Sequence, residues 1–489
     1  MTNALRHGVK IAQRTSRVNL GASAGVDRYL CSSVHVSSGF ADYVLNELVE
    51  PSVRATSPAC GIDLVALARH ATSSSARVMR LRLYLTGAMA VSTLGLLAAA
   101  VTGLAELLLL FLTCGGCGIF LAVFFDRLSL YRVLAAMVSP QVPMRDLAPA
   151  LPAHIEARLE ALNKSNVVIF EGGDAFIAWG RRLRDGWQMN IDATRAATDT
   201  NGKARTVIPF TPVDLHKAVT LAVRGAGVPD VEVHNRLFVE GHSVGVVPGL
   251  LPDPLDRPAS SVPAKSVRLG IERPRPDVRT YLCVEKTSWG GELAVNLNLR
   301  AAMVSGDLFI ECHAYVLLPL RAELTTVDHM PTGGAEIALR ALRDAFGALR
   351  QLRRVVKDER RESAVARKRR RALADDRRAI RKNRPFGRGA GLSIRAAAAA
   401  DERIFLFAYT DEEMYLNALQ RRILGAIETF LDQHGIDTAD FHQKLTNIIN
   451  NHSYAIGAVN AQNAQVGNNN QMSGPPTQQP PPPPWSSTP

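Results

Sequence analysis

The sequence lacks several short motifs that would identify an enzyme. It has no glycine-rich Lys-Ser/Thr loop for nucleotide phosphates, no glycine fingerprint of a dinucleotide-binding fold, and no His-Glu-x-x-His of a zinc protease. Its six cysteines form no disulfide framework, and no group of four cysteines and histidines has zinc-ligand spacing. We therefore expect no cofactor and no bound metal, and reduced thiols in a cytosolic setting.

A secretory signal is also missing, because the first residues have neither an apolar core nor a small-residue cleavage site. Two internal runs are instead free of charged residues, one over 83–104 and one over 107–125. At about 1.5 Å per helical residue they span roughly 33 and 28 Å, close to the hydrocarbon thickness of a bilayer. They predict a two-helix membrane hairpin, with a buried hairpin in a large soluble core as the alternative.

Charged flanks predict how this hairpin is oriented. Arginines lie just outside the two runs, whereas the short loop between the runs carries only Glu106. The excess of positive charge on the cytoplasmic side of membrane proteins then puts both termini in the cytoplasm. We expect a multi-pass protein of the cell membrane. The flanking arginines are Arg77, Arg80, Arg82, Arg127 and Arg132.

The rest of the chain predicts a mixed fold. Segments 281–287, 292–302 and 308–318 are separated by short glycine-containing turns, which is typical of an antiparallel β-meander. The expected fold class is a membrane α-helical hairpin plus a cytoplasmic α+β domain with this meander, a long basic helix and a disordered C-terminal tail. By residue number, we expect a helical cytoplasmic region over 1–76, the hairpin over 80–132, the α+β domain over 150–330, the basic helix over 335–385, a small helical element over 402–450 and the tail over 455–489.

One apparent catalytic motif occurs in the α+β region. Residues 241–245 read Gly-His-Ser-Val-Gly, the pattern of the nucleophile elbow in α/β-hydrolases. An elbow needs a helix directly after its serine, so that backbone N–H groups face the oxyanion. Pro248, Pro252 and Pro254 follow instead. This favours a loop, and we assign no catalytic residue.

Nearly all of the net charge of +12 lies in one segment. Residues 350–384 contain 16 Lys or Arg against five Asp or Glu, and no proline. They predict a long solvated helix or arm, which is either a spacer or a contact for anionic lipid. Nucleic acid is disfavoured as a partner, because no aromatic residues interleave the charges to stack on bases. The residues that we expect to contact lipid are Arg367, Lys368, Arg369, Arg370 and Arg371.

The C-terminal tail changes abruptly to Ala, Asn, Gln and Gly and ends in a proline run. Its residues 464–472 read Ala-Gln-Val-Gly-Asn-Asn-Asn-Gln-Met, which resembles the core of the RIP homotypic interaction motif and its bacterial counterparts in amyloid-signalling proteins. Ala464 departs from that pattern, which usually has Ile or Val there. An uncharged segment rich in Asn and Gln can stack in register and form amide ladders, and the alternative is an ordinary disordered tail. The matching residues are Gln465, Val466, Gly467, Asn470 and Met472.

These features lead to a hypothesis about function. The resemblance of the tail implies signalling or defence by self-assembly, while the remaining chain resembles uncharacterised bacterial membrane proteins, which implies no activity. We expect a membrane-anchored, non-enzymatic protein whose tail assembles with itself or with a partner protein. The alternatives are a membrane-bound enzyme with its site in residues 150–330, and a scaffold that binds anionic lipid through the basic helix. The sequence names no small-molecule ligand.

Overall fold

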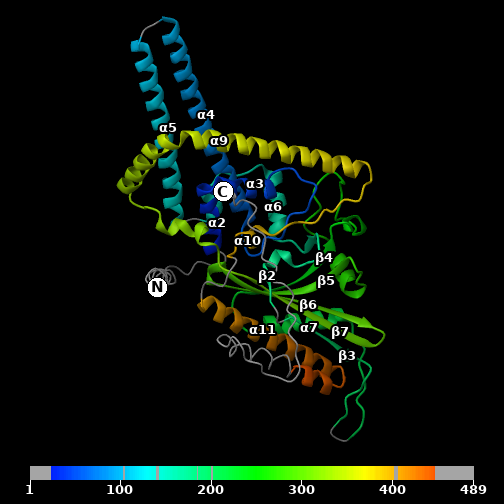
Figure 1. Ribbon diagram of the computed structural model, residues 1–489. Coiled ribbons are helices and arrows are strands. Elements are labelled where there is room, and N and C mark those ends of the chain that lie inside the picture. Colours follow the sequence, from blue (N-terminus) through cyan, green and yellow to red (C-terminus); the bar gives the residue numbers. More distant parts are fainter. Residues whose placement is uncertain are drawn as a thin grey trace, which may run out of the picture.

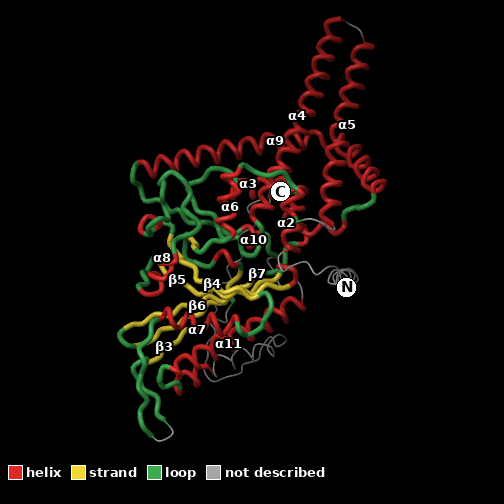
Figure 2. The backbone as a smooth tube through the Cα atoms, turned by 180° about the vertical axis from the view of Figure 1, so that it is seen from behind, coloured by secondary structure: helices red, strands yellow, loops and turns green. Residues whose placement is uncertain are grey.

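The computed structural model describes residues 24–102, 105–138, 143–183, 186–199, 202–400 and 406–445. A helical hairpin projects from one end of the molecule, and a seven-stranded sheet lies toward the other end (Figure 1). Short helices and loops fill the space between them (Figure 2). The chain is therefore a mixed α+β fold, as the sequence predicts.

The hairpin consists of α4 (Leu64–Thr102) and α5 (Ala105–Val138). Both helices are long and apolar enough to cross a membrane. Their 39 and 34 residues span roughly 58 and 51 Å at about 1.5 Å per residue, which is more than a bilayer needs. The extra length lies at the end of each helix that is nearest the sheet. There Leu67, Leu134 and Met137 are fully buried.

These buried helix ends share one core with the N-terminal helices. Helix α3 begins at a capping serine, because the Ser37 side chain accepts a hydrogen bond from Phe40 N, and it buries one apolar face. The N-terminal region thus packs around the foot of the hairpin. Besides α4 and α5, this core includes residues of α2 (Ala24–Val36), α3 (Ser38–Leu48), η1 (Met144–Leu147), α6 (Ala153–Asn163), η5 (Ala322–His329), α9 (Gly334–Arg381) and α10 (Ile394–Ala397).

The sheet has the strand order β1-β4-β5-β6-β7-β2, and β3 also pairs with β7. Strands β5, β6 and β7 form the expected antiparallel meander, and β7 is interior because it has neighbours on both sides. Among the strands that the structure describes, only β1 and β4 pair in parallel. The strands are β1 (Val167–Phe170), β2 (Arg181–Arg182), β3 (Trp187–Asp192), β4 (Val231–Glu240), β5 (Val278–Ser288), β6 (Leu293–Val304) and β7 (Asp307–Leu317).

Two helices cover the apolar face of the sheet, namely α7 (Pro212–Arg224) and α11 (Leu406–Gln433). Helix α7 starts at a capping box in which Thr211 and Asp214 satisfy each other's backbone N–H groups. Helix α11 is the helical element expected near the C-terminus, and Gly435 follows it with a positive φ of 73°. The apolar positions of α11 that face the sheet are Leu416, Leu419, Ile423, Ile427, Phe430 and Leu431.

The opposite face of the sheet is covered by irregular segments. These contain α10 (Ile394–Ala397) and the short turns η2 (Ile177–Trp179) and η4 (Trp289–Gly291), while α8 (Ala264–Glu272) packs beside β4 and β5. The basic segment forms α9 (Gly334–Arg381), a single helix of 48 residues. Figure 1 shows α9 curving past α5 and then crossing the end of the domain from which the hairpin projects.

Candidate functional site

The first candidate surface is the foot of the hairpin, where α9 crosses it (Figure 1). At this crossing Ala345 of α9 is fully buried in one cluster with Leu85 of α4 and Ile119 of α5. The ring of Phe346 lies 4.9 Å from the ring of Phe120. Helix α9 therefore meets the hairpin beside those ends of the two uncharged runs that are nearest the domain.

A buried ion pair lies about two helical turns closer to the domain. Arg77 Nη1 on α4 lies 2.9 Å from both carboxylate oxygens of Asp126 on α5. Its Nη2 donates to the main-chain oxygen of His35 on α2 at 2.9 Å. An uncompensated buried charge is strongly destabilising, so this pair ties three helices together where the uncharged runs end.

Beyond the ion pair, large apolar side chains are exposed on the hairpin and on α9 beside it. Leu94 and Leu97 of α4 are 65% and 64% exposed, and Leu339 and Phe346 of α9 are 68% and 59% exposed. Apolar surface of this kind marks a contact with lipid or with another protein.

The five basic residues at 367–371 lie on α9 and are all exposed. They belong to the same helix that crosses the foot of the hairpin, and no acidic residue interrupts them in sequence. The structure thus places them at the end of the domain that faces the hairpin (Figure 1). Their contact with lipid stays a prediction.

The residues predicted to drive self-assembly lie outside the described residues, the last of which is Leu445. The expectation for them is therefore neither supported nor opposed by any contact. These residues are Gln465, Val466, Gly467, Asn470 and Met472.

The serine motif does not form a nucleophile elbow. Ser243 follows β4 and is succeeded by a single 3-10 turn, η3 (Val244–Val246), and then by the proline-containing loop. A hydrogen bond from Ser243 lowers the pKa of Asp277, so its hydroxyl is bonded to a carboxylate. A serine hydrolase also needs a histidine after its serine in the chain, and His313 could be that residue. His313 lies on β7 with its Nε2 3.7 Å from Glu311 Oε2.

A second candidate site is a set of polar side chains on one face of the sheet, which sequence reasoning missed. Alternate residues of β4, β5, β6 and β7 point to this face and lie opposite one another in the strand register. We call this set the polar layer. It consists of Arg236, Tyr281, Glu285, Asn296, Asn298, Arg300, Glu311, His313 and Tyr315.

Two ion pairs balance the charges of the polar layer. Arg236 Nη1 lies 2.8 Å from Glu285 Oε1, and Arg300 Nη1 lies 2.8 Å from Glu311 Oε1. Trp179 Nε1 from the covering segment also donates to Glu285 Oε1 at 2.8 Å. All four charged side chains are only 12–13% exposed. The layer is therefore polar but carries no net charge from these pairs.

The titratable groups of the layer are held in fixed protonation states. Burial alone would raise the pKa of Glu311, but hydrogen bonds from His313, Arg300 and Tyr281 lower it to about 2. Burial raises the pKa of Tyr281, which donates to Glu311 Oε1 at 2.8 Å, to about 12. An acid–base catalyst works best with a pKa near the operating pH. This pair is therefore suited to positioning, not to proton transfer at neutral pH.

Two asparagines in the middle of the layer have no hydrogen-bond partner among the described residues. Asn298 is fully buried and Asn296 is 2% exposed, and both amide atoms of each side chain are unpaired. Leaving a buried polar group unpaired costs on the order of 1–3 kcal/mol. Such groups are satisfied in folded proteins by ordered water or by a bound molecule. The polar layer can therefore hold water or a small polar ligand.

The sequence shows the alternation that forms this layer, but it does not show that the layer is buried. Residues 295–300 alternate strictly between apolar and polar side chains, which usually indicates that the polar face meets solvent. Here residues 172–182 cover that face, and the Phe176 ring lies 4.9 Å from the rings of both Phe238 and Tyr281. The cover comes from a distant segment, so no local signal could reveal it.

Comparison with known families gives one match. A family model described as an AbeC-like domain matches residues 186–467, more than half of the chain. The matched part contains β3 to β7 and α7 to α11, whereas the hairpin, β1 and β2 lie outside it. No curated protein and no solved structure matches the chain.

Proposed function

The chain belongs to the AbeC-like domain family, and since that family has no stated function, we propose a role from the chain's own residues. In this proposal the chain is a membrane-anchored, non-enzymatic bacterial protein of signalling or defence, and it acts by amyloid-like self-assembly of its C-terminal tail. The observation that carries the anchoring is the position of the basic helix α9 across the foot of an apolar hairpin (Figure 1).

The geometry of the hairpin supports one-sided anchoring. Because α4 and α5 are antiparallel neighbours, the chain enters and leaves the hairpin on the same side. The other described elements also lie on that side (Figure 1). Insertion would surround Leu94 and Leu97 with hydrocarbon instead of water, and the positive flanks would keep both termini in the cytoplasm.

Helix α9 supports a contact with anionic lipid. Consecutive helical residues point about 100° apart, so two or three of the five basic residues at 367–371 can face a membrane surface at once. Each basic residue near an anionic surface contributes about 1 kcal/mol. The cluster would therefore add about 2–3 kcal/mol, or roughly 30- to 150-fold in affinity.

This lipid contact is tested by photo-crosslinking in nanodiscs. The full chain is embedded with phosphatidylglycerol that carries a photoreactive headgroup, and crosslinks on α9 are mapped by mass spectrometry. Replacing all five residues at 367–371 by Gln should reduce crosslinking to α9 by more than tenfold. Lys217→Gln on α7, across the sheet from the hairpin, is the matched control and should change nothing. Equal yields in all three proteins would rule out the contact.

Self-assembly of the tail is tested with a peptide of residues 455–474. Stacked in register, each copy would add one layer of about 4.8 Å and bury Val466 against its neighbours. We expect thioflavin-positive fibrils that seed further growth. Val466→Asp would stack like charges, and a side chain at Gly467 would separate the sheets, so either change should abolish fibrils. A peptide that stays monomeric at high concentration, even with seeds, would remove the main support for signalling.

The polar layer supports a second candidate function, ligand binding by a membrane-bound enzyme with its site in residues 150–330. Its specific support is the unpaired amides of Asn296 and Asn298. The full chain is screened against polar metabolites by thermal shift. A stabilisation that is lost in Asn298→Val, while the unliganded variant stays folded, would favour this function. Equal responses of the two proteins would exclude the layer as a ligand site.

A further inference from the structure

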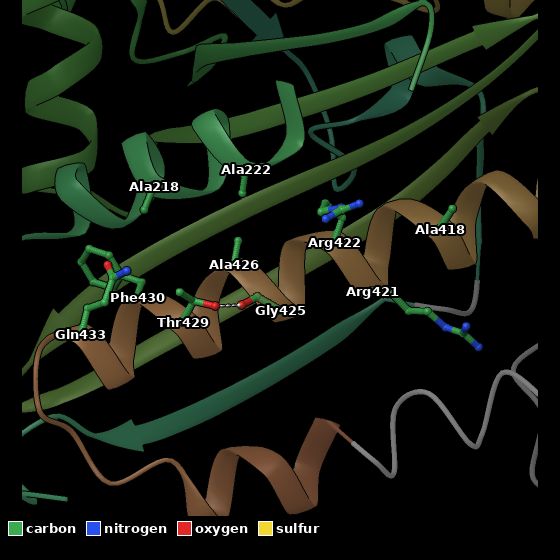
Figure 3. A pocket seen from close by; sticks show the side chains of 10 residues that line it. All are labelled: Ala218, Ala222, Ala418, Arg421, Arg422, Gly425, Ala426, Thr429, Phe430 and Gln433. Atoms are coloured by element: carbon green, nitrogen blue, oxygen red, sulfur yellow. Dashed lines mark hydrogen bonds between the residues drawn. The ribbon is translucent and has the colours of Figure 1, made fainter. Parts of the chain in front are cut away.

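The two helices on the apolar face of the sheet leave a groove between them. This space, which we call the α7–α11 groove, measures about 490 Å³. Figure 3 shows Ala218 and Ala222 of α7 on one side of it and Ala426 of α11 opposite them. Ala418, Gly425 and Thr429 of α11 also line it. The walls are thus mostly small side chains, which allow a close approach of another chain segment.

Gly425 in this groove is not explained by any contact within the described chain. A glycine inside a helix costs about 1 kcal/mol relative to alanine. A Cβ at this position would meet no described atom within 4 Å, so alanine would fit without a clash. The helix therefore carries a destabilising residue beside empty space. An occupant that packs directly on the helix backbone would account for it.

The shape and the polar groups of the groove favour an extended peptide that is rich in hydrogen-bond acceptors. The positions of α11 that line it run from 418 to 433, about 22 Å along the helix axis. That length matches about six or seven residues of extended chain. Thr429 and Gln433 offer polar groups at one end. The guanidinium of Arg422 lies between α11 and α7 and offers hydrogen-bond donors, whereas Arg421 points away from α7 (Figure 3).

The chain itself supplies such a peptide directly after its last described element. Phe441 is fully buried in the same apolar cluster as α7 and α11, and Lys444 Nζ donates to Asn190 O on β3 at 2.7 Å. The chain therefore leaves the described structure beside this layer, at Leu445. The family match nevertheless continues to residue 467, so the domain includes 22 residues, 446–467, that follow it.

The composition of this segment fits the groove. Residues 446–467 contain no Asp, Glu, Lys or Arg, and they are rich in Ala, Asn and Gln. Ile448, Ile449, Ile456 and Val459 supply apolar side chains. Asn and Gln amides can pair with the hydroxyl of Thr429, and alanines let the segment approach Gly425 closely.

We propose that the α7–α11 groove binds a stretch of six or seven residues from within 446–467 of the same chain. The docking is independent of what the tail does afterwards. One consequence does rest on the proposed self-assembly. Because residues 446–467 end within the assembly motif, docking of part of this segment would hold the motif beside the domain, and release from the groove would permit assembly.

Hydrogen exchange of the full chain in nanodiscs tests the docking. A run of six or seven amides within 446–467 should exchange at least tenfold more slowly than in the same peptide free in solution. Gly425→Trp fills the groove and should remove this protection, whereas Met414→Trp, at an exposed position of α11 outside the groove, should not. Unchanged protection of β6 shows that each variant is folded. Free-peptide rates in the wild-type chain would overturn the proposal.

A photo-crosslinker at Thr429 provides a readout that needs no bulky change in the groove. The proposal requires a crosslink within one chain to residues 446–467. A crosslink to a second copy, or to any other segment, would overturn it. The fibril test on residues 455–474 does not involve the groove. Fibrils without docking would therefore overturn only the proposal for the groove. Docking without fibrils would overturn only the proposed self-assembly.

Discussion

His216 provides a pH-dependent measure of how α7 packs on the sheet. Its side chain is 1% exposed, and Nδ1 donates to Asn235 Oδ1 at 2.9 Å. Its Nε2 is buried and has no partner among the described residues, so the pocket fits the neutral imidazole. Burial lowers the pKa of His216 to about 4.

The expected effect on stability follows from this pKa. In the unfolded chain the pKa of a histidine is about 6.5. Between pH 6.5 and pH 4 the unfolded state therefore binds a proton that the folded state excludes. The free energy of unfolding falls as the pH falls through this window, by at most about 1.4 kcal/mol per pH unit and by about 3 kcal/mol in total at pH 4.

The assay compares the wild-type chain with His216→Asn in urea denaturation from pH 8 to pH 4, followed by circular dichroism in detergent. The asparagine amide can replace Nδ1–H but does not titrate. At pH 8 the variant should be less stable, because its smaller side chain leaves a cavity. Its free energy of unfolding should depend less on pH. The difference in stability between the two proteins should therefore shrink by about 3 kcal/mol between pH 8 and pH 4. Parallel curves would refute the reasoning.

The remaining predictions concern a buried arginine, the serine motif and the hairpin. Arg395 of α10 is 1% exposed and its Nη2 donates to three main-chain oxygens, which Arg395→Met would leave without this donor. The substitution should lower the free energy of unfolding by about 1–3 kcal/mol, and an unchanged denaturation midpoint would count against this. Ser243→Ala should leave any cellular phenotype intact, and a fluorophosphonate probe should not label the chain; labelling that disappears in the variant would revive the hydrolase. Reporters after Thr2 and after Pro489 should both read cytoplasmic and one at Glu106 external; opposite sides for the two termini would contradict the hairpin.

Elements with strong local signals were predictable from the sequence. The uncharged runs predicted two adjacent apolar helices, and α4 and α5 contain them. Ser305 and Gly306 predicted the turn between β6 and β7. In the structure both residues have a positive φ, which glycine adopts easily. The apolar spacing over 416–431 predicted the buried face of α11.

Features that depend on long-range packing were not predictable. Val167 of β1 pairs in parallel with Leu237 of β4, seventy positions later, and nothing local fixes such a partner. The structure also packs α11 on the sheet, where the sequence suggested only a separate helical element. The position of α9 depends on Ala345 and Phe346 meeting the hairpin, whereas the sequence showed only its charge.

The polar layer was missed for a different reason. In sequence Asn296 and Asn298 look like the solvent-facing half of an ordinary amphipathic strand. They are buried because residues 172–182 cover them. The same segment covers Glu311 and its hydrogen-bond donors. Periodicity describes which residues share a face, but not what lies against that face.

The central claim, that clustering of the tails gives a membrane-anchored signal, is tested most directly in liposomes. The full chain is reconstituted with donor and acceptor fluorophores, and preformed fibrils of residues 455–474 are added on the side of the domain. The account predicts a rise in energy transfer that depends on seeds and is absent in Val466→Asp, because stacked like charges prevent the layers from forming. No rise in the wild-type chain, or an equal rise in the variant, would contradict it.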